Sequence, residues 1–103
     1  MQDLDTAVQE LRIEKSHRAF THKLAIVVTA IGAIPNNPPQ GFREATLVRL
    51  RELADETVAA IEGRIDTAGD GAEAQQKLAG TVYEVRKRIE DVELWFRHDT
   101  TRH

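Results

Sequence analysis

The sequence predicts an all-α fold, an elongated antiparallel three-helix bundle with short loops that dimerises into a larger helical bundle. Apolar residues recur at alternating spacings of three and four in three long segments, which is the helical period. Only two short clusters rich in Gly, Pro, Asn and Asp separate these segments. No stretch alternates with the period of two that a strand requires. With 103 residues we expect one domain, residues 1–103.

The first predicted helix covers residues 4–33. Its apolar seam runs without a gap, and an earlier apolar triplet is out of phase with it, so we expect the seam to shift near residues 11–13, as at a stutter. Gly32 and Pro35 end the helix, because proline cannot continue it. The seam consists of Ile13, His17, Phe20, Leu24, Val27, Ile31 and Ile34, and the triplet consists of Leu4, Val8 and Leu11.

The second predicted helix covers residues 38–66. Asn37 is its expected N-cap, Pro38 its first residue and Gln40 the reciprocal capping partner. Pro is favoured at the first helical position because its missing N–H needs no partner there. Its seam consists of Leu47, Leu50, Ala54, Val58, Ile61 and Ile65.

The third predicted helix covers residues 71–97 and leaves residues 98–103 as a tail. Gly69 is the expected C-cap of the preceding helix, and Asp70 with Glu73 reads as a capping box. Trp95 and Phe96 are expected to close one end of the bundle. The seam consists of Leu78, Val82, Val85, Ile89, Val92 and Phe96.

Residues 24–34 are apolar or small at almost every helical angle, which predicts a homodimer or higher homo-oligomer. One side of a helix in a three-helix bundle faces water, so this segment needs a further partner surface, and a second copy is the simplest source. Small side chains would allow a close approach, and two apolar residues of the third helix lie off its seam. The predicted interface consists of Ala25, Val28, Thr29, Ala33, Tyr83, Leu94 and Trp95.

The composition excludes several classes of site. There are no cysteines, so disulfides and thiolate sites are absent and a reducing, cytoplasmic location is expected. The N-terminal residues are acidic and polar, unlike a secretory signal, and the apolar run 24–34 is too short to span a membrane. No catalytic motif is present, and no cofactor is expected. The net charge of −3 disfavours nucleic acid, although Arg12, Lys15, Arg18 and Lys23 make a local basic cluster, as do residues 86–88.

Two histidines carry the candidate chemistry. Glu14 and His17 are three apart, which on a helix puts carboxylate and imidazole on one face, the pairing used by di-iron helical bundles. They are therefore a candidate metal site, although the alternative is a semi-buried His17 bonded to a partner helix. His17 and His22 are about 140° apart around a helix and cannot chelate one metal together.

His22 lies off the seam. The stretch from Thr21 to Leu24, followed after four residues by Thr29-Ala30-Ile31, resembles the phosphoacceptor box of histidine kinase dimerisation domains. Those domains are dimeric helical hairpins, and the resemblance implies that His22 accepts a phosphoryl group. Lys23 stands where the family has an acidic residue, and the family's proline is missing.

Two functions therefore remain open from the sequence. The first is a homo-oligomeric protein–protein interaction or adaptor module without enzymatic activity. The alternative is a histidine site in the first helix, with metal on Glu14 and His17 or phosphate on His22.

Overall fold

The computed structural model describes residues 2–67 and 71–101, with side chains placed over 2–65 and 71–98. Within that part of the chain the structure is all-α, as predicted. It contains four helices where the sequence predicted three: α1 (Gln2–Ile13), α2 (His17–Ala33), α3 (Glu44–Thr67) and α4 (Ala72–Thr101). The molecule is elongated, with extents of 52 × 22 × 18 Å.

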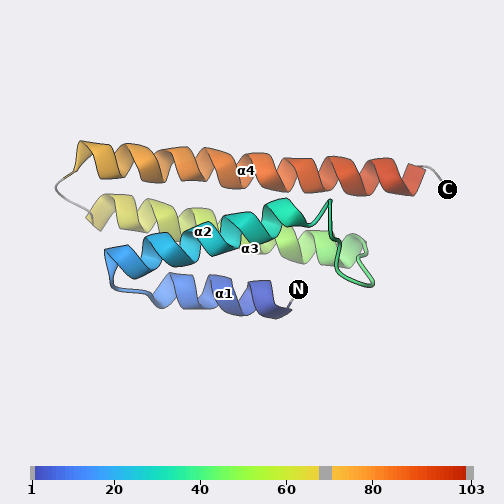
Figure 1. Cartoon of the computed structure of the whole chain (residues 1–103), viewed down its shortest axis with the longest axis horizontal. Coiled ribbons are helices and arrows are strands. Elements are labelled where there is room, and N and C mark those ends of the chain that lie inside the picture. The colour runs from blue at the N-terminus through green and yellow to red at the C-terminus, as the bar shows by residue number, and fades with distance from the viewer. Residues whose placement is uncertain (1, 68–70, 102–103) are drawn as a thin grey trace.

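The helices form a bundle in which α1 and α4 lie on opposite sides of α2 and α3 (Figure 1). α1 contacts α2 and α3, and α4 contacts the same two helices. The chain reverses direction at each connection, so α2 and α4 run in the same direction while consecutive helices are antiparallel (Figure 1). The core therefore lies between all four helices.

The prediction of one continuous helix over residues 4–33 is wrong. Residues 14–16 are not helical, and α1 folds back beside α2. Folding back buries Leu4, Val8 and Leu11, which a straight helix would carry past the end of the bundle into water. Ser16 caps the new helix start, since its Oγ accepts a hydrogen bond from the Ala19 N–H at 3.4 Å. Burial has overridden the helical preference of the local sequence.

The rest of the first seam is confirmed from Phe20 onward, but its first two members are exposed. Ile13 is 77% exposed, and His17 is exposed as the first residue of α2. The other predicted seams are buried or half-buried as expected. α3 also buries Leu53 and Thr57, as a helix between two neighbours should.

The predicted start of the second helix at Pro38 is also wrong, because α3 begins at Glu44. The chain from residue 34 to 43 instead crosses the end of the bundle, where Phe42 packs edge-on against Trp95 with ring centroids 5.3 Å apart. Gly41 has φ 75°, a left-handed conformation that suits glycine. The Arg43 N–H donates to Thr46 Oγ1 at 3.2 Å, the reciprocal half of a capping box.

The ends of the last two helices differ less from expectation. α3 continues to Thr67, and α4 continues to Thr101, so residues 98–101 of the predicted tail are helical. The predicted capping roles of Gly69 and Asp70 lie outside the described residues. Over the described residues, no helix has both the length and the apolar character that a membrane crossing needs.

Candidate functional site

The residues of the candidate metal site are separated by the break between α1 and α2. Glu14 lies outside any helix, so the helical premise for pairing it with His17 is wrong. Its carboxylate instead binds Lys23 Nζ at 2.7 Å and accepts the Ser16 N–H. These bonds, that from Lys23 first, lower the pKa of Glu14 and hold it ionised. Among the described residues no group of three or more His, Asp or Glu could hold a metal ion.

Arg64 of α3 fixes the same turn from the other side. Its guanidinium donates to the backbone carbonyl oxygens of Lys15, at 3.0 Å, and of Glu14. It also lies over the ring of Phe20, 4.5 Å from the centroid. The carbonyl groups that lose helical partners at the break are thus satisfied by a side chain 49 or 50 residues away.

His17 lines a hollow of about 350 Å³ between the first turns of α2 and α4. The residues opposite it, Glu73 and Lys77, come from α4. No sequence signal could have joined them to His17, because the two segments are adjacent only after the bundle has formed. The full lining is His17, Thr21, Glu73, Ala74, Lys77 and Leu78.

His22 is exposed on α2, with Lys23 beside it turned toward Glu14. The structure therefore keeps the imidazole accessible, as a phosphoacceptor would require. Part of the basic cluster around it is neutralised: Arg12 pairs with Glu56 at 3.1 Å, and Lys23 pairs with Glu14.

The predicted interface residues separate into different surfaces. Ala25, Thr29 and Ala33 are exposed on α2, together with Ile26, which is 51% exposed and was not in the predicted set. We call these four residues the outer face of α2. Val28, in contrast, is buried within the chain, and Trp95 is half-buried against Phe42.

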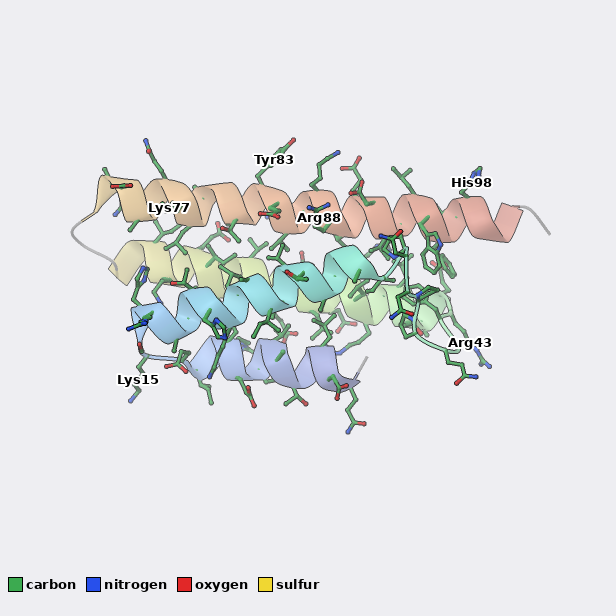
Figure 2. All side chains as sticks on the ribbon, in the orientation of Figure 1. Lys15, Arg43, Lys77, Tyr83, Arg88 and His98 are labelled. Carbon is green, nitrogen blue, oxygen red and sulfur yellow. The ribbon has the colours of Figure 1, made fainter. Side chains whose placement is uncertain are left out.

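Tyr83 and Leu94 define a second surface, the outer face of α4. They are 71% and 60% exposed, and Leu94 lies nine residues after buried Val85, about 180° around the helix. Tyr83 points away from the bundle (Figure 2). The two outer faces are separated by a hollow of about 220 Å³ between the helices, which includes Thr29 on one side and Glu84 on the other.

The outer face of α2 differs from the rest of the molecule in charge. Residues 24–42 contain no Asp, Glu, Lys or Arg, although 30% of the chain is charged. Charged side chains flank it instead: Arg88 of α4 lies against Gly32, where an added Cβ would be 3.2 Å from Arg88 Cδ. The result is an uncharged strip of small side chains with a charged rim.

The comparisons with protein-family models, curated proteins and solved structures give no match to this chain. What the protein does is therefore inferred from its own surfaces.

Proposed function

We propose that the chain is a protein–protein interaction module that associates with a second copy of itself through the outer face of α2. The uncharged segment 24–42 is the observation that carries this proposal. A surface without charge offers no attraction to an acidic or a basic partner. A second copy supplies a matching uncharged surface, and two-fold symmetry brings the two strips together.

The side chains of the strip suit helix packing. Ala25, Thr29 and Ala33 are four residues apart, so they lie along one side of α2 and would let another helix backbone approach closely. From Ala25 to Ala33 the strip is only about 12 Å long. Its area is smaller than the roughly 800 Å² per partner of a stable complex, so the association is weak and reversible. The outer face of α4 stays free for a different protein, as in an adaptor.

Sedimentation equilibrium of Ala25→Glu tests this proposal, with Ala59→Glu as the matched control on the exposed side of α3. We expect the wild type to dimerise in the upper micromolar range. Ala25→Glu should weaken dimerisation at least about tenfold, because each copy would bury a carboxylate, and Ala59→Glu should leave it unchanged. A wild type that stays monomeric up to about 1 mM, or equal effects of both variants, would contradict the proposal.

A second candidate function is phosphoryl acceptance by His22. Its support is the exposure of the imidazole on α2, near the uncharged strip where a partner would dock. Incubation with phosphoramidate, a small-molecule phosphoryl donor, followed by 31P NMR tests it. We expect a phosphohistidine signal that His22→Gln removes and His17→Gln retains. A signal that persists in His22→Gln, or none in the wild type, would contradict it.

A further inference from the structure

The three residues Glu14, Lys15 and Ser16, here called the hinge, contain no residue that forbids a helix. None of residues 1–31 is Gly or Pro, and Glu and Lys are good helix formers. Local sequence therefore allows α1, the hinge and α2 to join into one helix. The folded-back arrangement is held by tertiary contacts: the burial of α1 against α2 and α3, and the hydrogen bonds of Arg64 with the carbonyl oxygens of Glu14 and Lys15.

The angular position of Ile13 fits the buried side of a continuous helix but falls on the exposed side of the separate α1. It comes two residues after buried Leu11, about 200° around α1, which accounts for its 77% exposure. It also comes seven residues before buried Phe20, so in one continuous helix it lies within about 20° of the buried side of α2. The bent hinge thus leaves an apolar side chain in water, whereas in a continuous helix that side chain extends the buried side of α2.

We propose that α1 exchanges between two copies of the chain. The hinge becomes helical in each copy, and each α1 occupies the groove between α2 and α3 of the other copy. That groove is already complementary to α1, because Leu4, Val8 and Leu11 are buried in it within one chain. Exchange preserves these contacts and adds a contact at the two hinges, where the Ile13 side chains leave water near the two-fold axis.

This exchange goes beyond the proposed function, because it uses α1 and the hinge and not the outer face of α2. The two kinds of dimer also differ in their rate of dissociation. A dimer joined by the outer faces of α2 dissociates quickly, whereas in the exchanged dimer each α1 must leave its groove before the two copies can separate. The exchanged dimer therefore forms on refolding at high concentration and persists after dilution.

The substitution His17→Pro is compatible with the bent hinge but not with a helical hinge. His17 is the first residue of α2, where Pro is favoured, and Ser16 before it has φ −76° and ψ 126°, as a residue preceding Pro requires. The same substitution falls inside the continuous helix and breaks it. His17→Ala is the matched control, since it removes the imidazole without restricting the backbone.

The wild type and both variants are refolded from denaturant at about 1 mM and analysed by size-exclusion chromatography with light scattering. We expect a slowly dissociating dimer for the wild type and for His17→Ala. His17→Pro should form no dimer that persists after dilution, with the association constant of the exchanged dimer at least about 100-fold lower. No slowly dissociating dimer in the wild type, one that His17→Pro leaves intact, or one that His17→Ala also abolishes would overturn the proposal.

A charge-reversal pair identifies α1 as the exchanged element. Asp5 of α1 pairs with Arg49 of α3 at 2.8 Å, so Asp5→Arg and Arg49→Asp each put like charges together within one chain. Refolded as a mixture, the two chains regain an opposite-charge pair at both grooves only if α1 is exchanged. Native mass spectrometry should show more heterodimer than random pairing gives. Random pairing itself would overturn the exchange of α1.

Two controls complete the experiment. The double variant Asp5→Arg/Arg49→Asp restores an opposite-charge pair within one chain and should fold as the wild type does. Ala25→Glu should leave the slowly dissociating dimer intact while it weakens the reversible one. Failure of α1 exchange is thereby distinguished from failure of the proposed self-association through α2.

Discussion

Arg49 of α3 donates two hydrogen bonds to Oδ2 of Asp5 in α1, from Nε at 3.2 Å and from Nη2 at 2.8 Å, across 44 residues of sequence. Glu56, about two helical turns further along α3, accepts a hydrogen bond from Arg12 at the other end of α1. These pairs flank the buried side of α1 and hold it in register on α3. They are partly exposed, so they orient α1 more than they stabilise it, and the buried apolar side chains supply most of the free energy.

Shortening single side chains of α1 to alanine tests which of them supply that free energy. Leu11→Ala should lower the free energy of unfolding by about 2–4 kcal/mol, because Leu11 is fully buried and its removal leaves a cavity. Ile13→Ala, two residues away but exposed, should change it by less than about 0.5 kcal/mol in the monomer. Urea unfolding at low micromolar concentration measures both. Equal losses would mean that α1 is not docked as described.

Acidification should weaken the docking of α1. The hydrogen bond from Arg49 lowers the pKa of Asp5, as that from Lys23 does for Glu14, so both carboxyl groups bind protons more weakly in the folded chain than in the unfolded one. Their stabilisation is complete above the unfolded pKa of about 4 and is lost as the pH falls through the lower folded values. Asp5→Asn should flatten the pH dependence of urea unfolding below about pH 5, because it removes the carboxyl group whose pKa the pair with Arg49 lowers. A profile that Asp5→Asn leaves unchanged would contradict the role of the pair.

The substitutions Gly80→Ala and Gly41→Ala should change the stability of the protein in opposite directions. Gly80 lies inside α4, and an added Cβ meets nothing within 4 Å, so Gly80→Ala should stabilise the protein by about 0.5–1 kcal/mol. Gly41 also has free space but takes φ 75°, so Gly41→Ala should destabilise it by about 1 kcal/mol. Thermal unfolding of the two variants should shift the midpoint up and down respectively. An upward shift for Gly41→Ala would mean that the turn is not left-handed.

The aromatic contact at the end of the bundle can be followed by fluorescence, because Trp95 is the sole tryptophan. Phe42→Ala removes a ring that lies 5.3 Å from both Trp95 and Phe96, so the emission of Trp95 should shift to the red. The loss of stability should be about 1–3 kcal/mol, less than for a fully buried Phe. Tyr83→Ala, which removes an exposed ring, is the control and should change neither quantity.

Much of the fold could be predicted because three of its four helices have a regular apolar seam. The change of phase between Leu11 and Ile13 was visible in the sequence, but a phase change has the same pattern whether the helix continues or folds back. Whether the helix continues or folds back depends on whether burial of Leu4, Val8 and Leu11 outweighs the loss of helix continuity. That burial requires the groove between α2 and α3, which exists only in the folded chain.

The candidate site was less predictable. The exposure of Ala25, Thr29 and Ala33 agrees with the predicted strip, whereas Val28 is turned into the chain's own core. His17 appeared to belong to the seam because the period was extended through the hinge. Its neighbours Glu73 and Lys77 come from a helix more than 50 residues away, and spacing within one segment carries no information about them.

A spin–spin distance between α1 and α2 tests most directly whether α1 covers α2 in the same chain. Asp3→Cys and Thr29→Cys place two labels at exposed positions in a chain that has no other cysteine. At low micromolar concentration we expect a distance below about 20 Å, because the two helices pack roughly 8–10 Å apart. A distance near 39 Å, about 1.5 Å for each of the intervening residues of one straight helix, would contradict it.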